Sequence, residues 1–154
     1  MPPIVFVNPQ GLKEFVGKEI GLTEWFHLTQ ERIEQFAQAT EDRQWIHLDR
    51  VRASKESPYG GTIAHGFLTL SLISSFVHEV MRIDGGVRLA VNYGLNRVRF
   101  PAAVPAESRI RARVGLLACK EIADSVEAIY SVAVEIEGAG KPGCVAEWIV
   151  RYYA

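Results

Sequence analysis

The segment TEDRQWIHLD, residues 40–49, places carboxylate and imidazole side chains at a spacing that could support proton transfer. Asp42 and His47 are five positions apart, with Gln44 between them and Asp49 after them. A carboxylate and an imidazole can together take a proton from a bound water and return one to a neighbouring carbon. From the residues alone, His47 could equally be a hydrogen-bonded structural histidine, and Asp49 is suited to cap the next helix.

The motif follows a segment that predicts an amphipathic helix. Thr29 can cap this helix, and an acidic residue in the first turn suits the helix dipole. The positions that recur at helical spacing are Ile33, Phe36, Ala37 and Thr40. We therefore expect the helix to end where the motif begins.

A second helix is predicted over Ile63–Met81, which is apolar on nearly all sides. A helix of this kind in a globular protein is a buried core helix, so other elements must wrap it. The C-terminal half supplies β-rich segments at Val87–Phe100, Arg109–Ile122, Ser125–Glu137 and Cys144–Tyr153. Short turns between them favour antiparallel neighbours, and an earlier strand is expected in LTEWFHL, residues 22–28. This order predicts one α+β domain over residues 1–154, with an antiparallel sheet curled round a central helix.

Composition excludes several classes of function. The net charge is −1, which favours neither nucleic acid nor an anionic membrane, and RIRAR at residues 109–113 has the alternation of a solvated strand face. Cys119 and Cys144 lack metal-ligand spacing and are expected to be reduced, buried thiols. His47, Asp49 and His65 match no zinc motif, so we expect no metal. The N-terminus has no secretory signal pattern, and the longest uncharged apolar stretch is too short for a bilayer. A cytoplasmic protein is expected.

Three sequence segments together resemble a known family. They are DRQWIHLD at residues 42–49, IAHGFLTLSL at 63–72 and NYGLNRVRFPAAVP at 92–105. They resemble the MaoC-like dehydratases and R-specific enoyl-CoA hydratases, which have the hot-dog fold, and especially the subgroup of nodulation protein N-like proteins. The family's usual form is Asp-x-Asn-Pro-x-His-x-Asp. Here Gln44 and Trp45 replace the Asn-Pro pair, while the Asp-to-His spacing is kept.

The resemblance implies roles for individual residues. Asp42 and His47 would form the catalytic dyad, and the backbone N–H of Gly66 would bind the thioester oxygen. Ser74, eight positions after that glycine, would lie near the dyad. Gln44 would hold the loop or contact the ligand.

The implied reaction is the reversible hydration of a trans-2-enoyl-CoA by an R-specific hydratase. It would use no redox cofactor, because CoA enters as part of the substrate, and the resemblance also implies a homodimer. Two alternatives remain open from the sequence. One is hydrolysis of the acyl-CoA thioester, which other hot-dog proteins perform, and the other is a non-catalytic acyl-thioester-binding protein.

Overall fold

The computed structural model describes all residues from 1 to 154. The strands are β1 (Ile4–Phe6), β2 (Glu19–Leu22), β3 (Phe26–Leu28), β4 (Met81–Ile83), β5 (Leu89–Arg99), β6 (Ser108–Ile122), β7 (Ser125–Ile136) and β8 (Cys144–Tyr153). The helices are the 3₁₀ helix η1 (Pro9–Phe15) and the α-helices α1 (Gln30–Thr40), α2 (Trp45–Leu48), α3 (Arg50–Glu56), α4 (Gly66–Ser71) and α5 (Ile73–Val80).

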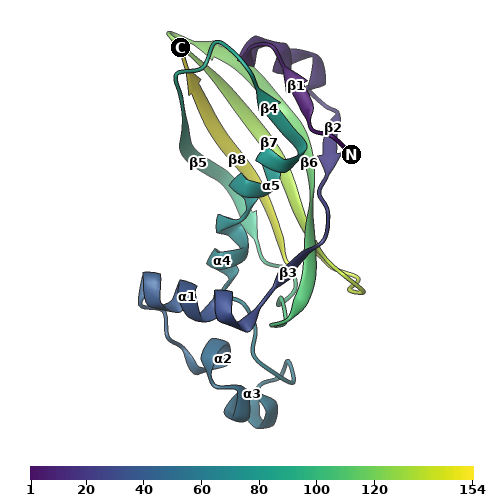
Figure 1. Ribbon diagram of the computed structural model, residues 1–154, viewed down its shortest axis with the longest axis vertical. Helices are drawn as coiled ribbons and strands as arrows, with labels where there is room; N and C mark the ends of the chain where they lie inside the picture. Colours follow the sequence, from purple (N-terminus) through teal and green to yellow (C-terminus); the bar gives the residue numbers. More distant parts are fainter.

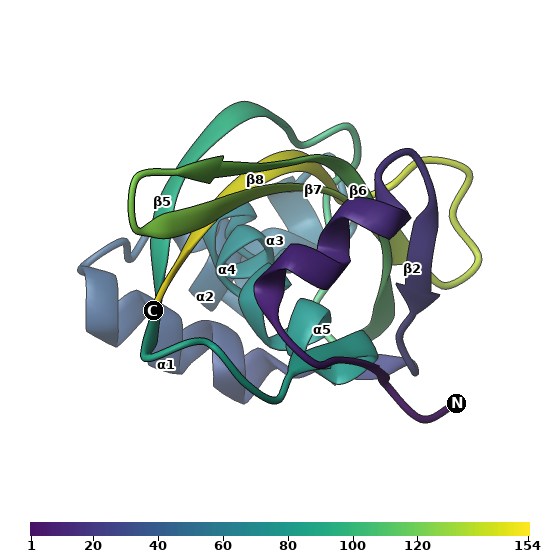
Figure 2. The same ribbon diagram turned by 90° about the horizontal axis from the view of Figure 1, so that it is seen from above.

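One antiparallel sheet forms the body of the molecule. Its strand order is β2-β6-β7-β8-β5, and β3 pairs with the N-terminal end of β6. The sheet curls over α4 and α5, as seen from above in Figure 2, while β1 and β4 form a small parallel pair beside it. Register shifts within β5 and β6 are of the kind that bends strands and supports such curvature. The predicted α+β architecture of the hot-dog fold is therefore confirmed.

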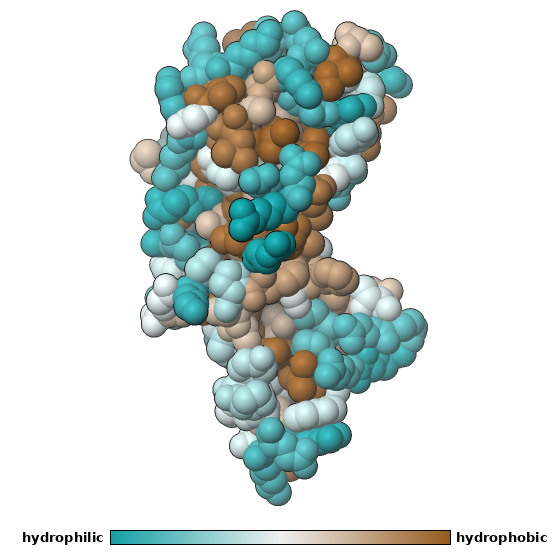
Figure 3. Space-filling model, turned by 180° about the vertical axis from the view of Figure 1, so that it is seen from behind, coloured by the Kyte–Doolittle hydropathy of each residue, from teal (hydrophilic) through white to brown (hydrophobic).

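The two faces of the sheet differ as the alternation of β6 predicts. Its inward residues Ile110, Ala112 and Val114 are fully buried against the helices. The three arginines that alternate with them point outward and pair with acidic residues, in the pairs Arg109–Glu137, Arg111–Glu135 and Arg113–Glu19. Figure 3 shows hydrophilic side chains around a hydrophobic centre on the molecular face seen from behind. The prediction of a solvated strand face at residues 109–113 is confirmed.

The central helix is shorter and less enclosed than predicted. At its start, residues 63–65 lie outside the helix, and Ile63 forms a β-bridge with Pro105. At its end, Met81 already belongs to β4. The helix is also divided at Leu72 into α4 and α5. Phe67 on α4 is 68% exposed, so the prediction of a helix buried on all sides is wrong. The sheet of one chain covers only one side of the helix.

Helices α1, α2 and α3 form a lobe at one end of the sheet (Figure 1). The predicted caps are confirmed: the Thr29 hydroxyl accepts from the N–H of Arg32, and the Asp49 carboxylate accepts from the N–H of Arg52. The segment predicted as a first strand, residues 22–28, instead contains the end of β2, a break and β3. None of the helices is long and apolar enough to cross a membrane.

Candidate active site

Asp42 is brought into position by the way α1 ends. Glu41, the C-cap residue, has φ of 65° in the left-handed region, and the chain leaves the helix there. Glutamate has no special preference for this conformation, so the surrounding contacts must hold it. Asp42 follows in an exposed turn between α1 and α2, and its backbone carbonyl faces the segment that precedes α4.

His47 is buried and its ring orientation is fixed by one hydrogen bond. It lies on the short helix α2, and its Nδ1 is 2.7 Å from the carbonyl oxygen of Ile63. The N–H of Ile63 in turn donates to the carbonyl of Ile46, which joins the two segments. A carbonyl oxygen can only accept, so Nδ1 carries the proton. In the neutral ring, Nε2 is therefore the atom that can accept a proton from a ligand.

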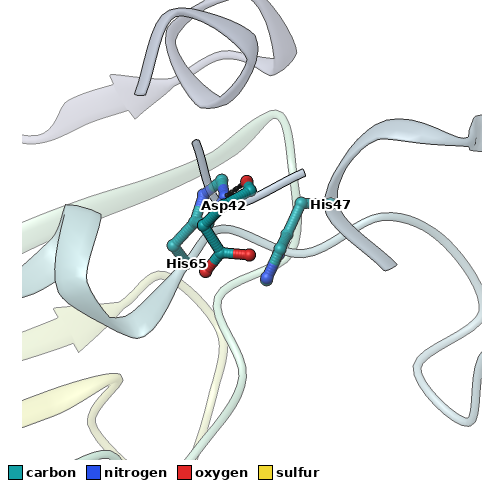
Figure 4. A group of neighbouring side chains, drawn as sticks. All are labelled: Asp42, His47 and His65. Carbon is teal, nitrogen blue, oxygen red and sulfur yellow. Dashed lines mark hydrogen bonds between the residues drawn. The ribbon is translucent and has the colours of Figure 1, made fainter. Parts of the chain in front are cut away.

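His65 completes the group from a third segment. Its Nε2 lies 2.9 Å from the backbone carbonyl oxygen of Asp42, to which it must donate. Its ring stacks on that of His47 at 3.8 Å between centroids and 24° between planes, with Phe36 on another side. Figure 4 shows Asp42, His47 and His65 converging, with the Asp42 carboxylate beside the tip of the His47 ring.

Potential ligand atoms of the three side chains lie within 4.8 Å of one another. Such a group could suggest a metal site, but the stacking opposes this use. The lone pair of an imidazole nitrogen lies in the plane of its ring, and two stacked planes do not converge on one nearby ion. One nitrogen of each ring is also engaged by a backbone carbonyl. The arrangement suits hydrogen bonding and proton transfer better than metal coordination.

The environment of His47 favours its neutral form. Burial lowers the pKa of the imidazole below its usual 6.5, and the neighbouring His65 acts in the same direction. The hydrogen bond to Ile63 and the negative charge of Asp42 raise this pKa and only partly offset the burial. At neutral pH the ring is therefore uncharged and its Nε2 can act as a base.

We expect the imidazole of His47 to titrate below pH 6.5 in the folded protein. Because the folded state then binds this proton less readily than the unfolded state, the free energy of unfolding should fall as the pH drops below 6.5. An NMR titration of the ring signals measures the pKa directly, and the signal absent from His47→Gln identifies the residue. A midpoint at or above 6.5 would contradict the expectation.

Gly66 opens α4 next to this group. Its N–H and that of Phe67 have no hydrogen-bond partner within the chain, as is usual for the first turn of a helix. Gly66 and His47 both line a cavity of about 240 Å³, together with Tyr59, Thr69 and the loop after β5. A Cβ on Gly66 would come within 3.1 Å of the Phe100 ring, so the glycine allows a close approach.

The remaining predicted site residues lie apart from this cavity. Ser74 lines a different cavity of about 190 Å³, between α4–α5 and β5–β8, with Trp148 and Asn92. Gln44 is the N-cap residue of α2, and its side chain makes no capping hydrogen bond. The structure thus groups Asp42 with His47, and His47 with Gly66, while Asp42, Ser74 and Gln44 are not among the residues that line the His47 cavity.

Three buried polar residues that support the site were not identified from sequence. Gln30, 2% exposed, donates from Nε2 to the carbonyl of His47 at 2.7 Å and accepts from the Thr62 hydroxyl. Thr69 is fully buried in the wall of the cavity. His65 is the third, and its ring contacts those of Phe36 and His47. No local periodicity marks these residues; a polar residue at an otherwise buried helix position is the one available signal, and it applies to Gln30 and Thr69.

Comparisons with known proteins find related sequences and a related fold. The family described as the MaoC like domain matches residues 12–136. A 3-hydroxyacyl-thioester dehydratase from Mycobacterium tuberculosis is 47% identical over 97% of this chain and 98% of its own length. A nodulation protein N from Rhizobium leguminosarum is 45% identical over 87% and 84%, respectively. An unliganded R-hydratase from Pseudomonas aeruginosa superposes with a TM-score of 0.72, at 22% identity over 96% of this chain and 86% of that one, which shows a shared fold.

Proposed function

Because the chain belongs to the family of MaoC-like dehydratases, we propose that it catalyses the reversible, R-specific hydration of trans-2-enoyl-CoA to 3-hydroxyacyl-CoA. The observation that carries this proposal is the pairing of the Asp42 carboxylate with a neutral His47. The hydrogen bond to Ile63 leaves Nε2 of His47 as an acceptor beside that carboxylate. Two acceptors side by side suit the binding and deprotonation of a water molecule.

The chemistry balances with these groups alone. The water oxygen forms a bond to C3 while one water proton passes to the Asp42–His47 pair. The π electrons of the C2–C3 double bond move toward the thioester, whose oxygen gains negative charge. A proton from the pair then reaches C2, the charge returns, and the pair ends as it began. Positioned acid–base groups of this kind contribute about 10²–10⁴ in rate.

We assign the stabilisation of the thioester oxygen to the first turn of α4. The unpartnered N–H of Gly66 is the donor, and the absence of a side chain on its Cα lets a thioester approach. In the same proposal, Gln44 shapes the loop, and Ser74 contacts a more distant part of the substrate from its separate cavity. The reaction requires neither metal nor redox cofactor, and CoA takes part only as the carrier of the acyl group.

Incubation with crotonyl-CoA tests the reaction. We expect loss of the conjugated enoyl-thioester absorbance without release of free thiol, and chiral chromatography should find the R configuration at C3 of the product. Free CoA thiol released without hydration would instead identify a thioesterase. If the protein neither hydrates crotonyl-CoA nor releases thiol from it, the proposed function is overturned and a binding protein is the remaining alternative.

We further propose that the enzyme is a homodimer paired through β5. This strand is bonded to β8 on one side only, and it exposes the apolar side chains of Leu89, Val91, Tyr93 and Leu95. A long apolar edge strand invites association unless another strand covers it. A second copy can add its own β5 in an isologous contact, because the same edge is then complementary to itself.

The substitution Val91→Glu should shift the protein toward the monomer in light scattering at micromolar concentration. Val91 lies opposite Arg151 within its own chain, so glutamate there is tolerated by the protomer but puts a charge into the apolar contact proposed between two copies. The control is Val51→Glu, which introduces the same charge at an exposed valine on α3, away from β5. A monomeric mass for the unmodified protein would refute the dimer.

A further inference from the structure

Thr69 has a hydroxyl group that the protein itself does not satisfy. The residue is fully buried on α4, and Oγ1 has no hydrogen-bond partner. The one other buried side-chain atom in this condition is Nδ1 of His65, four positions earlier. Leaving a buried polar group without a partner costs about 1–3 kcal/mol. His65 is the N-cap residue of α4 and Thr69 lies one turn further along it, so the two unpaired atoms indicate a place where a polar ligand completes the hydrogen bonding.

The usual partner of a helical threonine is not free at this position. Hydroxyls in helices commonly bond back to a carbonyl one turn earlier, as Thr40 does to Phe36 in α1. For Thr69 that carbonyl belongs to His65, and it already accepts the N–H groups of both Leu68 and Thr69. The hydroxyl therefore remains available to a ligand.

The cavity that Thr69 lines is the one that contains His47. Its walls include His47, Gly66 and Thr69, and the cavity of about 240 Å³ has room for a small polar group as well as part of an acyl chain. Apolar residues such as Ile63, Ala64 and Val104 form much of the rest. A buried hydroxyl among such side chains is one of the few fixed polar groups that a substrate would meet.

We propose that the Thr69 hydroxyl binds the oxygen atom that adds to C3: the attacking water in hydration and the 3-hydroxyl group in dehydration. This inference rests on the proposed function. A water that donates its two hydrogens to the Asp42 carboxylate and to Nε2 of His47 has two lone pairs left. A hydrogen bond from Thr69 to one of them leaves the other directed at the substrate. Thr69 is in this way a substrate-binding residue that selects the attacking lone pair.

The thioester oxygen is the competing ligand for this hydroxyl. It differs from the 3-hydroxyl in being present in every acyl-CoA, including butyryl-CoA, which lacks both the double bond and the 3-hydroxyl. Butyryl-CoA and 3-hydroxybutyryl-CoA therefore distinguish the two assignments. In a variant without the Thr69 hydroxyl, a loss of affinity for 3-hydroxybutyryl-CoA alone would locate Thr69 at C3. An equal loss of affinity for both compounds would locate it at the thioester.

The test uses Thr69→Val, which keeps the shape and removes the hydroxyl, and Thr69→Ser, which keeps the hydroxyl. For Thr69→Val we expect kcat/KM to fall by about tenfold or more in both directions, as for one lost hydrogen bond. The inhibition constant of butyryl-CoA should stay within about twofold, since that ligand cannot use the bond. Thr69→Ser should retain most activity. As a control for hydroxyl removal, Ser54→Ala on α3 loses a hydroxyl bonded within its own helix and should leave activity unchanged.

Thermal unfolding of the same variants separates this role from a structural one. Because the Thr69 hydroxyl has no partner in the chain, Thr69→Val should keep or raise the Tm. A lowered Tm with unchanged kcat/KM would overturn the inference, and so would an equal loss of affinity for butyryl-CoA and for the substrate 3-hydroxybutyryl-CoA. If the unmodified protein hydrates crotonyl-CoA and Thr69→Val does so equally well, only this inference fails. If the unmodified protein has no hydratase activity, the proposed function fails and this inference with it.

Discussion

Replacing Asp42 by asparagine or His47 by glutamine is expected to lower kcat/KM for crotonyl-CoA hydration by about 10²–10⁴ while the protein stays folded. Each change removes one proton-accepting atom and keeps a side chain of similar size. Asp42 is exposed and forms no ion pair, so Asp42→Asn should have little effect on the Tm. Glutamine at position 47 can still donate toward the carbonyl of Ile63, the bond that His47 makes.

The matched controls are Glu41→Gln and His78→Gln. Glu41 is the carboxylate adjacent to Asp42 and pairs with Arg43 at the surface, and His78 is exposed on α5. Both should hydrate crotonyl-CoA at the unmodified rate. Steady-state kinetics with all four variants, together with circular dichroism, provide the measurement. Activity near that of the unmodified enzyme in both Asp42→Asn and His47→Gln would remove this pair from the mechanism.

The second large effect is expected for Gln30→Leu, through stability. Gln30 joins α1 to the carbonyl of His47 and to the hydroxyl of Thr62, and all three residues are buried. Leucine would leave both of these groups without a partner, and the free energy of unfolding should fall by about 2–4 kcal/mol. Urea unfolding at a fixed protein concentration measures the loss.

The same substitution should also lower kcat, because α2 and the ring of His47 lose one of their attachments. Gln38→Leu is the control, since Gln38 is exposed on the same helix and a leucine there leaves no buried group unpaired. An unfolding free energy for Gln30→Leu equal to that of Gln38→Leu would show that the buried amide is dispensable.

Much of the architecture follows from local patterns in the sequence. The alternation of residues 109–113 is sufficient to divide β6 into a buried and a solvated face, because successive side chains of a strand point to opposite sides. The Thr29 cap and the recurrence of Ile33, Phe36 and Ala37 define α1, of which Ile33 and Ala37 are buried. The central helix was predicted less well, since composition shows that its residues are apolar but not how much surface the neighbouring strands cover.

The sequence by itself determined the fold class, the family and the spacing of Asp42 and His47. The tertiary structure alone decided the chemical state of the site. The proton on Nδ1 of His47 follows from a bond across 16 positions to Ile63, and His65 reaches Asp42 across 23 positions. It also left the hydroxyl of Thr69 unpaired beside His47 and placed Ser74 in another cavity. These contacts join separate elements, and no local periodicity encodes how two elements meet, because that depends on the packing of the whole chain.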